Sequence, residues 1–187
     1  MAVLSPTDRA FWEENGYVII HNAVPKENLD AVIDAIWEFL DVDRNNPESW
    51  YTAPISKAGM LEMYHHQALW NNRQSPRVYG AFAEIWGRED LWVSLDRANM
   101  NPPARKPDWD YQGMVHWDID TLADPIPMMV QGVLYLADTD ATGGGFERTI
   151  ERRREGLGQN AHQVTVTRRQ LDLADADAEA RGRLAHE

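Results

Sequence analysis

The chain has 187 residues, a hydrophobic share of 43% and a formal net charge of −12 at pH 7, which together predict one packed domain and disfavour a disordered chain. The negative charge repels nucleic-acid backbones, and no apolar run approaches the roughly 20 residues of a membrane helix, so we expect a cytoplasmic protein with neither partner. The chain has no Cys, which excludes disulfides and thiolate metal sites and leaves His and carboxylates to hold any metal.

The first ninety residues are predicted to be mainly helical. Capping residues, apolar side chains at helical spacing and turn residues between them define the expected elements. These are a helix between the cap at Ser5 and the stop at Gly16, a strand over 17–20, a helix from Pro25 to Leu40, a loop over 41–58, and helices over 60–70 and 76–86, the last capped by Ser75.

From Leu91 the apolar residues alternate instead, which predicts strands. The expected strands are one that begins at Leu91 and runs toward Asn101, then 113–119, 128–137 and, near the C-terminus, 163–167. Helices first and strands afterwards predict an α+β fold, with an antiparallel sheet or barrel in the second half. We expect one domain over 1–146, followed by an Arg-, Ala- and Asp-rich tail over 147–187 that has no aromatic residue or Lys and is no separate domain.

His116-Trp117-Asp118 lies in one of the predicted strands. The two-residue period of a strand places the imidazole and the carboxylate on the same face, where they can chelate one metal ion. They would form two thirds of the 2-His-1-carboxylate triad that holds Fe(II). Six His and thirty acidic residues also produce such a pair by chance, so the alternative is a hydrogen-bonded pair on a half-exposed strand.

Five blocks of sequence occur in one order around this pair: Phe11–Val18, Leu95–Pro103, His116–Asp118, Gln131–Thr139 and Gly143–Phe146. Together they resemble the phytanoyl-CoA dioxygenase family. The resemblance covers about residues 5–146. It implies that the helices are followed by a double-stranded β-helix, a jelly roll of the cupin type.

The same resemblance implies an Fe(II)- and 2-oxoglutarate-dependent dioxygenase that hydroxylates a small organic substrate. His116 and Asp118 would be iron ligands, and Asn99 and Gln131 would contact 2-oxoglutarate. For each of the last two, a satisfied polar group within a sheet is the alternative. The alternative for the whole chain is a non-catalytic β-barrel binding or interaction domain with an incomplete metal site.

The C-terminal part departs from the family pattern. Family members carry a distal His and, about ten residues later, an Arg that pairs with the far carboxylate of 2-oxoglutarate. Here His162 is followed too closely by Arg168, and His186 is penultimate, so neither is assigned as the third ligand. The change of composition is typical of an out-of-frame reading of a GC-rich gene, and we expect a jelly roll that is incomplete at its C-terminal end.

Overall fold

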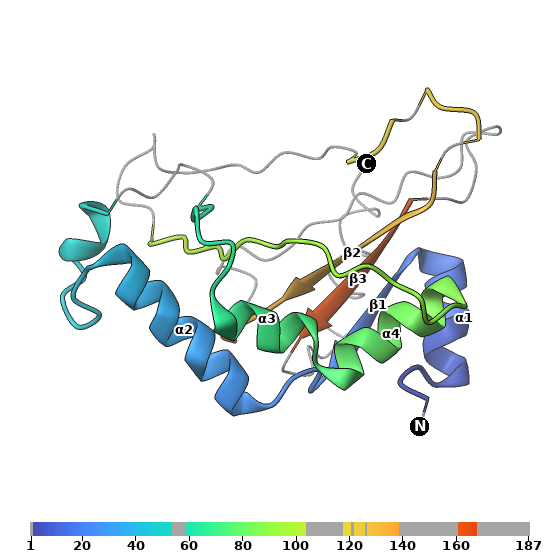
Figure 1. Ribbon diagram of the computed structural model, residues 1–187, viewed down its shortest axis with the longest axis horizontal. Helices are drawn as coiled ribbons and strands as arrows, with labels where there is room; N and C mark the ends of the chain where they lie inside the picture. Colours follow the sequence, from blue (N-terminus) through green and yellow to red (C-terminus); the bar gives the residue numbers. More distant parts are fainter. Residues whose placement is uncertain are drawn as a thin grey trace, which may run out of the picture.

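The computed structural model describes residues 2–53, 59–103, 118–120, 122–125, 127–138 and the strand 161–167. Helices dominate the N-terminal part, as predicted, and Figure 1 shows them around a small sheet. The elements are α1 (Pro6–Asn15), β1 (Tyr17–His21), α2 (Lys26–Leu40), the 3-10 helix η1 (Ser49–Tyr51), α3 (Gln67–Arg73), α4 (Pro76–Trp86), β2 (Met129–Leu134) and β3 (Ala161–Thr167).

Helix α1 begins and ends where the sequence predicts. The Ser5 hydroxyl accepts the amide of Asp8 at 3.1 Å, and the Asp8 carboxylate accepts the amide of Ser5 at 2.9 Å, which completes a capping box. At the other end Gly16 has φ 69° and donates its amide to the Trp12 carbonyl at 2.7 Å. A left-handed glycine of this kind ends a helix without steric cost.

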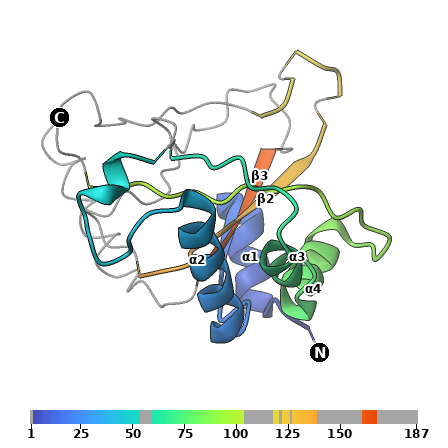
Figure 2. The same cartoon turned by 60° about the vertical axis from the view of Figure 1, so that its left-hand side comes forward.

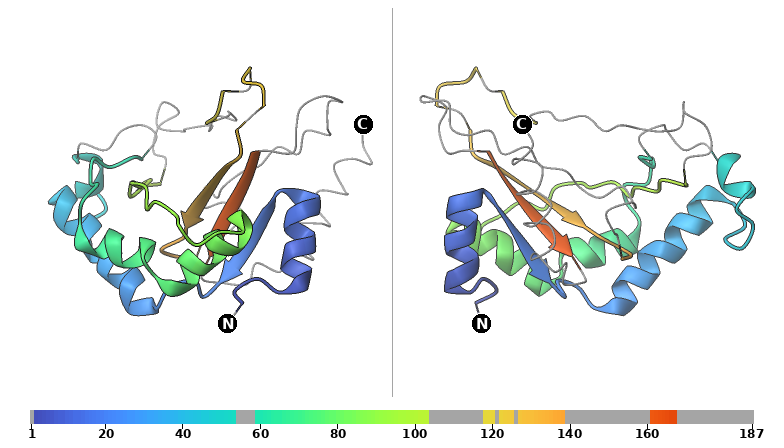
Figure 3. Two further views of the ribbon diagram at one scale, coloured as in Figure 1. Left: turned by 45° about the vertical axis from the view of Figure 1, so that its right-hand side comes forward. Right: turned by 180° about the vertical axis from the view of Figure 1, so that it is seen from behind.

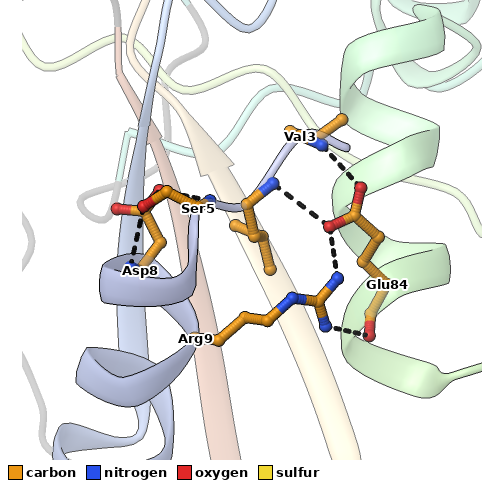
Figure 4. A network of polar contacts seen from close by, with 6 residues as sticks. Val3, Ser5, Asp8, Arg9 and Glu84 are labelled. Atoms are coloured by element: carbon orange, nitrogen blue, oxygen red, sulfur yellow. Dashed lines mark hydrogen bonds and ion pairs between the residues drawn. The ribbon is translucent and has the colours of Figure 1, made fainter. Parts of the chain in front are cut away.

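The residues before α1 are fastened to α4 by one carboxylate, that of Glu84 (Figure 4). Glu84 accepts the amides of Val3 at 2.5 Å and Leu4 at 3.1 Å, and the Arg9 guanidinium at 2.6 Å. Burial opposes ionisation, but these three donors outweigh it and hold the pKa of Glu84 below its ordinary value. The N-terminal segment is therefore part of the folded unit, and its residue Leu4 is buried.

Helix α4 spans the predicted residues and begins at Ser75, although Ser75 does not cap it through its side chain. The Ser75 hydroxyl instead donates to the Ala23 carbonyl at 3.0 Å, in a buried contact with the segment after β1. This bond joins the start of α4 to the end of the first strand.

The three strands form one parallel sheet in the order β1-β3-β2. This pairing differs from the expected antiparallel arrangement, because β1 from the N-terminal part occupies one edge and β3 lies between the other two. Strand β3 confirms the strand predicted within the tail. Most of the predicted strand over 113–119 lies outside the described residues, so the double-stranded β-helix stays a prediction.

One face of the sheet packs against α1 and α4. Val18 and Ile20 are buried on β1 and alternate with half-buried neighbours. The cluster on this face also holds Leu4, Trp12, Ala23 and Ala81, with Val3, Val78, Ile85, Val130 and Leu134 packed against it. Figure 3 shows α4 along this face and α1 beside β1.

A second apolar cluster joins α2 to α3, which lie side by side (Figure 2). Buried residues of both helices meet Leu61, Met63 and Ala98, which come from the segments before α3 and after α4. Leu136, just after β2, also packs against this cluster. The two clusters therefore connect the helices to both ends of β2.

Two predicted elements have different structures. The helix predicted over 60–70 begins only at Gln67, because residues 60–66 are not helical and Met60 pairs with Asn99 in an antiparallel bridge. The strand predicted from Leu91 toward Asn101 is not formed apart from the bridge at Asn99, and Trp92 there is 98% exposed. Along the described chain, no helix is both long and apolar enough to cross a membrane.

Candidate metal and co-substrate site

Three of the four predicted site residues lie in the described part of the chain, namely Asp118, Gln131 and Asn99. His116 lies outside it. Asp118 opens a short described segment before β2, Gln131 lies within β2, and Asn99 follows α4 at a greater distance along the chain. The structure therefore tests how the acidic half of the predicted pair is held.

Asp118 and Gln131 are brought together by a direct hydrogen bond. The Gln131 Nε2 donates to the Asp118 Oδ2 at 2.6 Å, which is short for a bond from a neutral donor to a carboxylate. Asp118 is exposed and Gln131 is half-buried. The bond ties the end of the predicted metal-binding motif to the middle of β2.

The strand itself fixes where the Gln131 amide projects. Its neighbours Val130 and Leu134 pack against the cluster on the α4 face, so Gln131 lies on the opposite face by strand alternation. Gln131 is in register with Gln163 on β3, and Val130 with His162.

The loop between Asp118 and β2 is folded by a second carboxylate, that of Asp120. Its Oδ1 accepts the amide of Leu122 at 2.9 Å, and its carbonyl accepts the amide of Ala123 at 3.3 Å. A side chain that accepts the amide two residues on forms an Asx turn. This turn lies directly after Asp118, in the segment that connects Asp118 to β2.

Asn99 lies in a different local environment, beside Gly59 and Asn101. The Asn101 Nδ2 donates to the Asn99 Oδ1 at 2.7 Å, whereas Gln131 hydrogen-bonds Asp118. The flanking backbone is held by bonds from the Leu61 amide to the Ala98 carbonyl at 3.1 Å and from the Met100 amide to the Gly59 carbonyl at 2.9 Å. The structure therefore does not join Asn99 to Gln131 by a hydrogen bond.

Gly59 gives the Asn99–Asn101 pair its space. It has φ 71°, and a Cβ at this position would lie 2.2 Å from the Asn101 Oδ1 and 2.8 Å from the Asn99 Oδ1. Such contacts are too close for any other residue to fit without movement of the two amides. The sequence-based interpretation of Asn99 did not include Asn101 or Gly59, although the two Asn are spaced as neighbours on one face of an extended chain.

The adjacent His65 and His66 belong to no group of three potential metal ligands among the described residues. Both are exposed at the start of α3, where the His66 Nδ1 accepts the amide of Ala68 at 3.2 Å and caps the helix. Within the described ranges, no three His, Asp or Glu side chains lie close enough together to hold a metal ion. His116 lies outside these ranges, so the predicted triad stays a prediction.

Sequence reasoning missed the contact between Asp118 and Gln131, although it selected both residues. The signal was their separation by a Pro-containing loop that joins a predicted strand to β2, since such a connection brings the two ends together. The interpretation of Gln131 as a co-substrate contact took no account of this proximity.

Comparison with known proteins gives one similarity. Ava biosynthesis cluster protein O of Aspergillus versicolor is 28% identical to the chain over an alignment of 145 residues, and the match covers 72% of this chain and 46% of that protein. The chain thus spans less than half the length of this relative. No family model matches the chain, and no solved structure matches it significantly.

Proposed function

We propose that the chain forms an Fe(II)- and 2-oxoglutarate-dependent dioxygenase, or part of one, that hydroxylates a small organic substrate. The observation that carries the proposal is the Asp118 carboxylate, held at 2.6 Å by Gln131 of β2 and preceded by His116 at the spacing of a chelating pair. The order of the sequence blocks from Phe11 to Phe146 supports the same family. The relative's name contains "biosynthesis cluster", which supports a small molecule as substrate.

The donor set fits a divalent iron ion. An ionised carboxylate offers about four acceptor positions on two oxygens, so the bond from Gln131 is compatible with coordination by Asp118. Ligating carboxylates are commonly hydrogen-bonded in this way. A neutral imidazole from His116 would add the nitrogen ligand that Fe(II) takes together with carboxylate oxygen.

The residues of the chain have separate tasks in this proposal. Asp118 supplies a negative oxygen ligand at the solvent-exposed end of a loop, His116 supplies a neutral ligand, and Gln131 holds the carboxylate in one orientation. When bound, iron lets O2 oxidise 2-oxoglutarate to succinate and CO2, with one oxygen atom entering succinate and the other entering the substrate C–H bond. The contact of Asn99 with 2-oxoglutarate stays a prediction from the sequence resemblance.

The experiment is an assay of succinate formed from 2-oxoglutarate in the presence of Fe(II), ascorbate and O2. Slow turnover without substrate is expected for the folded wild-type chain. The Asp118→Ala variant should lose it, since one of the iron ligands is gone. The matched control is Asp124→Ala, which removes another exposed carboxylate of the same loop and should leave turnover unchanged.

A second candidate is a non-catalytic binding domain, and the same hydrogen bond favours it. In that case the Asp118–Gln131 contact would serve only to attach the loop to β2. Asp118→Ala would then lower the melting temperature, while folded wild-type protein would bind no metal and form no succinate. Equal stability of the two proteins, with succinate formed by wild type alone, would reject this candidate.

A further inference from the structure

We propose that Gln131 is a positioning residue, which orients the Asp118 carboxylate toward the metal, and that it does not bind 2-oxoglutarate. The inference rests on the proposed function, because it assigns Gln131 a task within that site. It replaces the co-substrate role that the sequence resemblance implies for this residue.

The chemistry of the contact fixes its direction. A carboxylate only accepts hydrogen bonds, so the amide of Gln131 must present its NH2 group to the Asp118 Oδ2 and not its carbonyl oxygen. A 2-oxoglutarate carboxylate would also require the NH2 group of Gln131. One N–H of that group is already directed at Asp118 at 2.6 Å, and this favours the positioning role.

The strand gives the amide a fixed origin. Gln131 lies between Val130, which packs on the α4-facing cluster, and Gly132, and its backbone is in register with β3. Asp118, by contrast, lies in the loop before β2, which contains the Asp120 turn. The bond therefore holds the proposed ligand Asp118, which lies in a loop, at a place set by Gln131 of β2.

Loss of such a bond weakens metal binding in a recognisable way. Partners that orient metal ligands through hydrogen bonds typically contribute about 10- to 100-fold to metal affinity. A residue that contacts only the co-substrate would leave affinity for the metal alone unchanged. Loss of a positioning residue therefore weakens metal binding, whereas loss of a co-substrate contact weakens 2-oxoglutarate binding.

The test uses Mn(II) as the probe, because its free-ion electron paramagnetic resonance signal falls when the ion binds. Gln131→Met keeps a similar volume without a donor, and Gln131→Leu likewise removes the donor without adding a charge. Each variant should bind Mn(II) about 10- to 100-fold less tightly than wild type. At saturating Mn(II), the affinity for 2-oxoglutarate should remain within a factor of two or so of wild type.

The matched control is Gln67→Met on α3. The Gln67 Nε2 donates to the Asn71 Oδ1 at 2.8 Å in another exposed contact between side chains, so this variant removes a similar bond away from the site. It should leave the affinities for Mn(II) and 2-oxoglutarate unchanged. Circular dichroism and thermal melting establish that each variant is folded, and Gln131→Leu replaces Gln131→Met if the latter is not.

The outcomes separate this inference from the proposed function. Wild-type protein that binds Mn(II), with equal affinity in the Gln131 variants and weaker 2-oxoglutarate binding, would overturn the positioning role alone. Folded wild-type protein that binds no Mn(II) would overturn the proposed function and this inference together. Weaker Mn(II) binding in both Gln131 variants, with Gln67→Met unchanged, supports the positioning role.

Discussion

The N-terminal helical region and the region around Asp118 are held together by different means. In the first, helix caps lie within a few residues of the groups they satisfy, as in the Ser5–Asp8 capping box, and two buried clusters join the helices. In the second, Asp118 depends on a side chain of β2 and on the pairing of β2 with β3. The framework is thus stabilised by burial, and the candidate ligand is positioned by single polar contacts.

This difference separates stability from function. Apolar burial is worth several kcal/mol at a single buried position, whereas a single net hydrogen bond contributes about 1 kcal/mol. Substitutions in the clusters should therefore act on the free energy of unfolding. Substitutions at Asp118 and Gln131 should act mainly on ligand affinity.

The largest expected loss of stability is that of Leu61→Ala. Leu61 is 1% exposed and packs in the cluster between α2 and α3, so the cavity should cost about 2 to 5 kcal/mol. Leu134→Ala on β2 is the comparison, because Leu134 is only partly buried and should cost less. Urea unfolding of both variants measures the difference, and an equal loss would contradict the contrast between the two regions.

A smaller loss is expected from Gly59→Ala, with Gly87→Ala as its matched control. Both glycines have positive φ, 71° and 66°, but nothing lies within 4 Å of a Cβ at Gly87. Gly87→Ala should cost about 1 to 2 kcal/mol from backbone strain alone. Gly59→Ala should cost more in the same urea experiment, because its Cβ also displaces Asn99 and Asn101, and equal costs would show that these amides move freely.

The smallest expected effect is the pH-dependent contribution of Glu84. Its pKa is lower in the folded than in the unfolded protein, because the Val3 and Leu4 amides and Arg9 outweigh its burial. The contribution is therefore complete above the unfolded pKa of about 4.3 and is lost as the pH falls through the lower folded pKa.

Glu84→Gln tests this sign. At about pH 7 the variant should be less stable than wild type by roughly 1 kcal/mol, since a neutral acceptor replaces a charged one. The difference should shrink as the pH falls through the lowered pKa of folded Glu84, because Glu84 then becomes protonated in wild type as well. Urea unfolding at a series of pH values checks this, and a difference that does not depend on pH would mean that the charge of Glu84 contributes nothing.

Local signals were sufficient for much of the helical framework. The Ser5 cap and the Gly16 stop predicted α1, and Ser75-Pro76 predicted the start of α4, because the groups that end a helix lie within a few residues of it. The strand at residues 17–20 was likewise evident from β-branched residues. These elements need no information about distant parts of the chain.

Elements that depend on distant partners were predicted less well. Residues 60–64 were assigned to a helix, but they are not helical, and Leu61 and Met63 are buried at alternate positions. The bridge partner of Met60 is Asn99, which lies far along the chain. In the sheet, β1 and β2 both pair with β3, and both pairings are parallel. Neither partner can be identified from local spacing.

For the candidate site, the sequence supplied the residue types but not their contacts. It selected Asp118 and Gln131 and gave them separate roles, whereas the structure joins them by a hydrogen bond. It selected Asn99 without its partner Asn101. Side chains that meet across a loop become neighbours only when the loop closes, so their contact is a property of the fold.

The most direct test of the account is an anaerobic titration of the wild-type chain with Fe(II) and 2-oxoglutarate. The account predicts a weak visible charge-transfer band in the wild-type protein, unchanged in Asp124→Ala and lost in both His116→Ala and Asp118→Ala. Folded wild-type protein without the band, or a band that persists in Asp118→Ala, would contradict the assignment of Asp118 as an iron ligand.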